Sequence, residues 1–124
     1  MAGAMITAIV EDNENIIDVL KQIAQEHNIE FGLIQGGSGQ LKDFDIVLTK
    51  QRGRMEPVRH TRTCTLDMAH GKIEKTKEGY NCLLNATILD EDKSIKTGQL
   101  ISGKAAGELR IVIKKSDMKK IRIA

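Results

Sequence analysis

The chain has 124 residues, of which 40% are hydrophobic and 29% charged, and this excludes a disordered polypeptide and favours one globular domain spanning residues 1–124. No apolar run approaches the ~20 residues that cross a bilayer, so the sequence excludes a membrane-spanning helix. The net charge of +2 is unevenly spread, because residues 1–49 carry two cations and eight anions whereas residues 50–124 carry 17 and nine. This asymmetry allows a nucleic-acid surface, although folding can also mix both halves into one patchwork surface.

The N-terminal residues and the two cysteines indicate in which cellular compartment the protein resides. Acidic residues within 11–14 come too early for the apolar core of a secretory signal, so we expect a cytoplasmic protein. Residues 1–4 are typical of a short leader, with Met5 as the expected start. Cys64 and Cys82 lack the spacing of metal ligands, and we expect both to be buried free thiols.

The first elements follow from the pattern of apolar residues. Residues 5–10 form a short run rich in β-branched side chains, which predicts a strand. Residues 12–15 then supply an N-cap and an acidic first turn, and apolar residues recur at helical spacing as far as Asn28. Asn28 can adopt the left-handed conformation that ends a helix. This is the one main helix that the sequence predicts.

Beyond Asn28 the apolar residues alternate with period two. We expect breaks at the glycine-rich residues 36–39, at a loop over 51–60, at a His70-Gly71 turn and at the charged residues 90–93. Between these breaks the pattern predicts strands over residues 30–35, 44–50, 61–69, 72–75, 80–89, 109–114 and 121–123. One helix followed by many closely spaced strands predicts an α+β fold, with a single antiparallel-rich β-sheet and the helix near the N-terminus.

No intact catalytic or metal-binding motif is present. Residues 36–39 lack the lysine and hydroxyl residue of a phosphate loop, so a bend or bulge in a strand is expected there. No serine or histidine lies in a recognisable catalytic arrangement. We therefore assign no catalytic residue, no metal ligand and no cofactor.

The densest basic segment supplies the candidate nucleic-acid-binding residues, which are Arg52, Arg54, Arg59 and Arg62. The Arg52-Gly53-Arg54 run matches the core of an AT-hook, a minor-groove element, but Met55 and Glu56 stand where the hook requires proline. Any association with DNA through this loop and the C-terminal lysines is expected to be electrostatic, because no element that reads sequence is visible. A solvated loop is the alternative.

Four segments together resemble one known family, and they have the sequences FGLIQGGSG (31–39), NATILDED (85–92), TGQLISG (97–103) and ELRIVI (108–113). Their order and spacing are similar to those of the plants and prokaryotes conserved (PPC) domain, which is joined to AT-hooks in plants and usually stands alone in prokaryotes. The resemblance covers nearly all of residues 5–114. It implies an α/β fold with one antiparallel sheet, similar to that of the zinc enzyme acetolactate decarboxylase, and a homotrimer.

The resemblance also implies the loss of a metal site. Prokaryotic members commonly carry a His-x-His pair on the long strand and a third histidine in a Gly-Gly-His-Leu segment, and these are associated with a metal. Aligned on residues 90–92, the three positions fall on Leu83, Asn85 and Gln99. Leucine cannot ligate a metal and neutral amides are poor zinc ligands, so the resemblance implies a degenerate site without metal.

Two uses of the former site remain open. Asn85 and Gln99 can hydrogen-bond each other and stabilise the sheet, or they can present polar groups to a small ligand together with Glu108, which matches an acidic position of the family. The leading interpretation is a non-enzymatic homotrimer that acts as an assembly, regulatory or small-ligand-binding module. One alternative is a DNA-binding protein with a basic surface, with DNA or another protein as partner. The other is a lyase-like enzyme with a pocket at the trimer interface.

Overall fold

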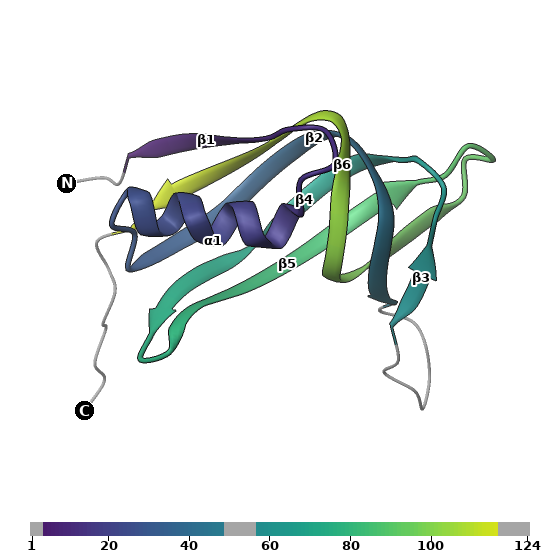
Figure 1. The fold of residues 1–124 in the computed structure, drawn as a ribbon. Helices are drawn as coiled ribbons and strands as arrows, with labels where there is room; N and C mark the ends of the chain where they lie inside the picture. Colours follow the sequence, from purple (N-terminus) through teal and green to yellow (C-terminus); the bar gives the residue numbers. More distant parts are fainter. Residues whose placement is uncertain (1–3, 49–56, 117–124) are drawn as a thin grey trace.

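The computed structural model describes residues 4–48 and 57–116, which form one antiparallel sheet and a single helix near the N-terminus (Figure 1). Within these ranges the elements, in chain order, are β1 (Met5–Val10), α1 (Ile16–Glu26), β2 (Phe31–Leu48), β3 (Val58–His60), β4 (Cys64–Thr76), β5 (Gly79–Leu89) and β6 (Ile95–Lys115). This architecture confirms the fold class that the sequence predicts. No helix in the described part of the chain is long and apolar enough to span a membrane.

The strand order is β1-β6-β5-β4-β2-β3, and β2 pairs additionally with β6. This extra pairing closes a ring through β2, β4, β5 and β6, so one face of the sheet turns inward and the other outward. The long strands β2 and β6 accommodate the closure by bending, and their register shifts at four places along the shared edge. Figure 1 shows both strands curving while α1 lies across the sheet at the other end of the molecule.

The helix begins where the sequence predicts it. The side chain of Asn15 accepts a hydrogen bond from the backbone N–H of Asp18 at 3.1 Å, which satisfies one of the free donors of the first turn. The buried face of α1 consists of Ile16, Ile17, Leu20 and Ala24. Asn28 has a φ of 53°, which confirms its expected role in ending the helix.

The core is almost entirely aliphatic and lies between α1 and the inner face of the sheet. Alternate residues of each strand point inward, so that Leu84, Ala86 and Ile88 of β5 are buried, whereas the residues between them point outward. Phe44 is the one fully buried aromatic side chain among the described residues. Cys64 is buried as expected, and Cys82 is half-buried against the core.

Several predicted breaks are wrong. The bulge predicted at residues 36–39 is confirmed by register shifts between β2 and β6, but β2 continues through these residues instead of ending there. His70 and Gly71 lie inside β4 rather than in a turn, because the inward-facing Gly71 packs directly against the backbone of Leu83 on β5. β6 is continuous over the predicted gap before residue 109, and the second half of the predicted loop over 51–60 contains β3. The predicted strand over 121–123 lies outside the described residues.

Candidate functional site

The family-equivalent positions meet in one row on the outer face of the sheet. Asn85 on β5 lies directly opposite Gln99 on β6, and on its other side it lies opposite His70 on β4. Directly opposed residues of antiparallel strands point to the same face, with Cβ atoms ~5 Å apart. His70, Asn85 and Gln99 therefore form a continuous line across three strands, which we call the polar row. Asn85 and Gln99 are half-buried, and His70 is exposed.

Most of the side chains near the polar row are apolar or uncharged, although Lys72, two residues from His70 on β4, lies opposite Leu83 and pairs with Glu74 at 3.6 Å. The neighbours of Asn85 along β5 are Leu83 and Thr87, and the hydroxyl groups of Thr87 and Thr97 lie 3.3 Å apart. β5 contains no charged residue between Gly79 and Leu89. Four large hydrophobic side chains are exposed around the row, with exposed fractions of 38% for Leu33, 59% for Met68, 66% for Ile95 and 43% for Ile101. We call this surface of β4, β5 and the first part of β6 the outer face.

The amide groups of Asn85 and Gln99 remain available to a partner. Among the hydrogen bonds formed by the described residues, none joins the side chains of Asn85 and Gln99 to each other. Each amide carries both donors and an acceptor. Because the two side chains share one face and are only half-buried, they can bond to groups that approach the outer face.

Glu108 lies apart from the polar row. It sits nine residues beyond Gln99 on β6, which corresponds to ~30 Å of extended strand, and its carboxylate pairs with Arg110 at 3.1 Å. Together with Ile9, Glu11, Asp12 and Gly107 it lines a separate cavity of about 390 Å³. The backbone N–H of Gly107 donates to Asp12 at 2.8 Å, and this bond lowers the pKa of the Asp12 carboxyl.

The donor set of the polar row does not suit a metal ion. The three positions that the resemblance implies hold Leu83, which has no donor, and the neutral amides of Asn85 and Gln99, so that His70 supplies the one imidazole of the row. Within residues 4–48 and 57–116, no group of three or more His, Cys, Asp or Glu side chains could hold a metal ion.

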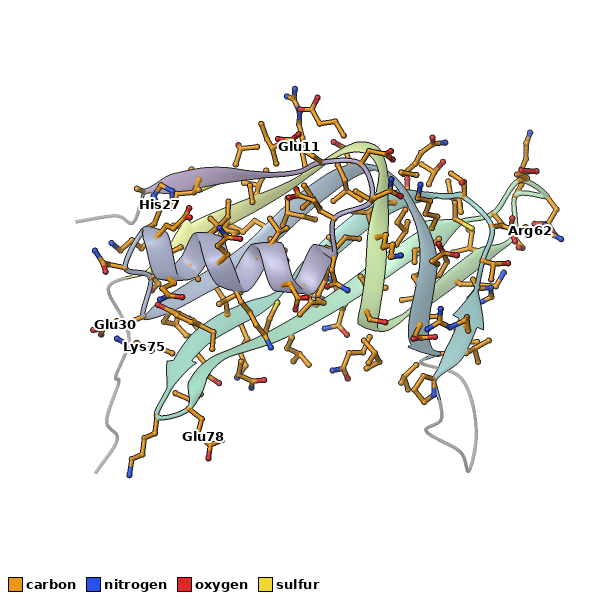
Figure 2. All side chains as sticks on the ribbon, viewed as in Figure 1. Glu11, His27, Glu30, Arg62, Lys75 and Glu78 are labelled. Atoms are coloured by element: carbon orange, nitrogen blue, oxygen red, sulfur yellow. The ribbon has the colours of Figure 1, made fainter. Side chains whose placement is uncertain are left out.

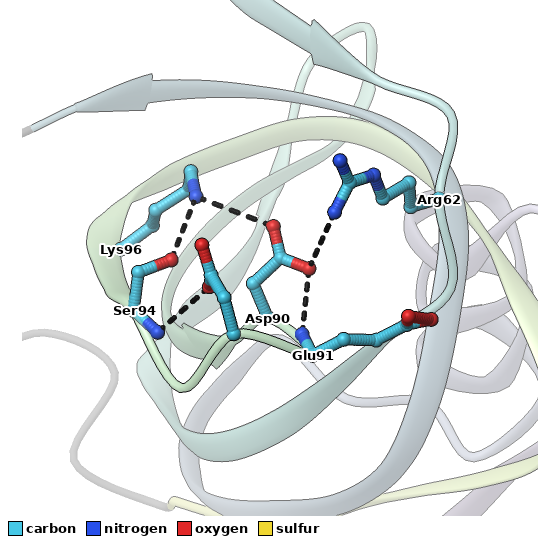
Figure 3. A network of polar contacts seen from close by, with 6 residues as sticks. Arg62, Asp90, Glu91, Ser94 and Lys96 are labelled. Carbon is cyan, nitrogen blue, oxygen red and sulfur yellow. Dashed lines mark hydrogen bonds and ion pairs between the residues drawn. The ribbon is translucent and has the colours of Figure 1, made fainter.

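The candidate DNA-binding arginines that the structure describes are both engaged with carboxylates. Arg59 donates to Asp45 at 3.1 Å, and Arg62 lies 3.5 Å from Asp90, which also pairs with Lys96 at 3.6 Å (Figure 3). Arg52 and Arg54 lie outside the described residues. Lys75, near the opposite end of the molecule from Arg62, is remote from this cluster, so these two cations do not share one basic patch (Figure 2).

His60 lies near the charged side chains of Arg62, Asp90 and Lys96, but its own ring is partly buried against an aromatic side chain. The ring of His60 stacks on Phe44 with centroids 5.0 Å apart, and its Nε2 atom is buried without a hydrogen-bond partner. Burial lowers the pKa of His60, and the nearby Lys96 acts in the same direction.

Burial has the opposite effect on the two thiols. It raises the pKa of the Cys64 thiol, and it raises the pKa of Cys82 to about 11. Neither thiol is activated as a nucleophile.

Sequence reasoning found Asn85 and Gln99 but missed His70 as their neighbour. The His-Gly pair favours a turn, and only the register between β4 and β5 places His70 opposite Asn85. The alternation of residues 62–68 would place His70 on the same face as the buried Cys64 and Leu66, and only the bulge between Leu66 and Met68 turns His70 outward.

A match to a protein-family model identifies the family of this chain. Residues 1–117 match the model of the Plants and Prokaryotes Conserved (PCC) domain, which is the PPC domain. The chain belongs to this family. A PPC protein from Pyrococcus horikoshii has the same fold, with a TM-score of 0.83 at 17% identity over 98% of this chain and 84% of that one. A search of curated proteins finds no match.

Two further solved structures, one described as metal-containing and one as a proposed DNA-binding protein, share this fold. A metal-containing protein from Archaeoglobus fulgidus aligns with a TM-score of 0.79 at 10% identity, covering 94% of this chain and 81% of that one. A proposed DNA-binding protein from Bacteroides thetaiotaomicron aligns with a TM-score of 0.79 at 16% identity, covering 98% and 86%. At these identities the likeness establishes the fold alone.

Proposed function

We propose that this PPC domain is a non-enzymatic assembly module of a prokaryotic cytoplasm, and that three copies associate through the outer face. The observation that carries the proposal is the polar row within a strand surface that exposes Met68, Ile95 and Ile101 and whose middle strand, β5, carries no charge. Depletion of charge at the centre of a surface is typical of the core of a protein interface. The stoichiometry of three rests on the family resemblance.

The outer face has the composition that self-association needs. Met68 and Ile95 are 59% and 66% exposed, so burying them against a second copy removes apolar area from water. A face with few charges also meets its own copy without strong like-charge repulsion. The amide groups of Asn85 and Gln99 can then donate to and accept from polar groups of the adjoining copy, which fixes the register of the contact.

A small polar ligand is the other use of the same row. The amides would bind it between the copies, near the centre of the outer face, where the apolar surroundings exclude water. The donor set for a metal-dependent lyase is missing at Leu83, Asn85 and Gln99. The proposal therefore assigns no catalytic residue.

A pair of arginine substitutions on β5 tests the assembly. Asn85→Arg places a charged side chain at the centre of the outer face, whereas Asn81→Arg places the same side chain on an exposed position near the β4–β5 hairpin. We expect sedimentation equilibrium to show an increase of at least tenfold in the dissociation constant for Asn85→Arg and little change for Asn81→Arg. Because residue 85 points outward, far-UV circular dichroism should show both variants folded. Equal association of the two variants, or a monomeric wild type, would contradict the proposal.

DNA binding through the basic surface is the second candidate. It is favoured by structural neighbours from Bacteroides thetaiotaomicron and Ralstonia eutropha that are proposed to bind DNA, and by the arginine-rich segment containing Arg52, Arg54, Arg59 and Arg62. The ion pairs of Arg59 and Arg62 with carboxylates reduce the positive charge available to phosphates.

The salt dependence of duplex binding tests this second candidate. Affinity for a fluorescent duplex should fall steeply between 50 and 200 mM salt. Asp90→Asn should raise the affinity, because it removes a negative charge beside Arg62 and Lys96. Absence of binding at 50 mM salt, or no effect of Asp90→Asn, would remove DNA as a partner.

A further inference from the structure

β1 is an edge strand that lacks the usual protection against pairing with another strand. Within the described residues it pairs only with β6, so its other edge is open. The opposite edge of the sheet is formed by β3, which is three residues long, contains Arg59 and follows Pro57. Short length, charge and proline are devices that prevent edge-to-edge pairing. β1 has six residues and contains neither charge nor proline.

The hydrogen-bond pattern identifies which backbone groups of β1 are free. The backbone N–H of Lys115 donates to the carbonyl oxygen of Ala4 at 2.8 Å, which makes these two residues a hydrogen-bonded pair. Such pairs alternate along an antiparallel ladder. In the register of β1 and β6, therefore, Ile6 and Ala8 also bond to β6, and the N–H and C=O groups of Met5, Thr7 and Ile9 point to the open edge.

The side chains of the same three residues are exposed. Met5 and Ile9 have exposed fractions of 57% and 45%, and Thr7 lies between them on the same side of the strand. The residues between them point toward the core, where Ala8 and Val10 are fully buried. One edge of the molecule thus offers unpaired backbone groups together with two apolar side chains.

We propose that β1 pairs antiparallel with β1 of a second copy, with Thr7 opposite the partner's Thr7. The strand is self-complementary in this register, because Met5 faces the partner's Ile9 and Ile9 faces the partner's Met5. The three residues with free backbone groups then form three hydrogen-bonded pairs, and the apolar side chains form cross-strand contacts on one face. The sheets of the two copies become continuous across a two-fold axis.

This contact is distinct from the assembly proposed above. It uses the open edge of β1, whereas the polar row lies on β4, β5 and β6. A strand of six residues buries little area, so the contact is expected at high protein concentration and the outer-face assembly at low concentration. The two contacts can therefore be separated by titrating the protein concentration and by blocking the outer face.

Thr7→Pro tests the edge contact without disturbing the fold. Proline removes the N–H of residue 7, which points away from β6, and an edge strand tolerates proline at such a position. Thr7→Val is the matched control, because it keeps the N–H. Ile9→Lys is a second variant that leaves the backbone intact and places a charge opposite the partner's Met5. Far-UV circular dichroism of each variant establishes that it is folded.

The measurement is sedimentation velocity of the full chain from 10 µM to 1 mM, carried out in the Asn85→Arg background and in the wild type. In the Asn85→Arg background we expect the mass to rise toward two chains, with Thr7→Pro and Ile9→Lys lowering the association constant at least tenfold and Thr7→Val leaving it unchanged. The amides of Met5, Thr7 and Ile9 should exchange more slowly as concentration rises. A mass that stays at one chain up to 1 mM, or that Thr7→Pro leaves unchanged, would overturn the edge contact. A wild-type protein that is monomeric at 10 µM would contradict the proposed association through the outer face, but it would not contradict the edge contact.

Discussion

Asn85 and Gln99 occupy directly opposed positions on β5 and β6, so the two strands hold both amide groups on the outer face of the sheet. The pairing does not depend on the side chains themselves, because the flanking pairs of Leu84 with Leu100 and of Ala86 with Gly98 fix the register from the inner face. Substitutions at residues 85 and 99 can therefore change what the outer face binds while leaving the core intact.

The close contact between β6 and β2 leaves no room for a side chain at Gly98, which lies beside the polar row. A Cβ atom at residue 98 would collide with the carbonyl oxygen of Val47, whereas a Cβ at Gly36 would meet nothing within 4 Å. We expect Gly98→Ala to lower the free energy of unfolding by about 2 kcal/mol or more, since the backbone must shift to accept it. Gly36→Ala should change it by less than about 0.5 kcal/mol. Urea denaturation measures both, and equal effects would show that β2 and β6 are not in this contact.

We expect the free energy of unfolding to fall in mild acid because of His60. Its pKa is lowered in the folded protein because burial penalises the charged imidazolium, so the unfolded chain binds this proton more readily. The stabilising contribution is complete above the ordinary histidine pKa of ~6.5 and is lost as the pH falls below it. Carboxyl groups with a lowered pKa, such as that of Asp12, titrate below this window.

Thermal unfolding between pH 7.5 and pH 5.0 tests this dependence. His60→Phe keeps an aromatic ring stacked on Phe44 and removes the titrating group, so its melting temperature should vary less with pH than that of the wild type. A wild-type slope retained in His60→Phe would show that another group titrates.

The two cysteines should be unreactive in the folded protein. With a pKa of about 11, Cys82 is thiolate in only ~1 molecule in 1,000 at pH 8, and burial raises the pKa of Cys64 as well. A thiol reagent such as Ellman's reagent should label neither residue rapidly at pH 8 and both after unfolding in urea. Rapid labelling of either thiol in the native state would mean that its strand opens locally.

The helix could be predicted from the sequence because its signals are local. The cap at Asn15, the apolar stripe that contains Leu20 and the left-handed Asn28 all lie within one short segment, and all three are present in the structure. The same holds for β1, whose bounds agree with the predicted residues 5–10.

The long strands could not be delimited in the same way, because distant partners determine where they continue. Gly71 is typical of a turn, yet it lies inside β4 because the backbone of Leu83 packs against it from β5. Residues 36–39 likewise remain in β2 because they pair with the far end of β6. Glu108 was grouped with Asn85 and Gln99 from its position in the family pattern, but the length of β6 places it in another cavity.

The most direct test of the central claim is the mass of the wild-type chain in solution. Sedimentation equilibrium at 10 µM and pH 7.5 should give three times the 13.7 kDa of one chain, and Asn85→Arg should reduce this mass. A mass of 13.7 kDa for the wild type, or an assembly that Asn85→Arg leaves intact, would contradict the role of the outer face.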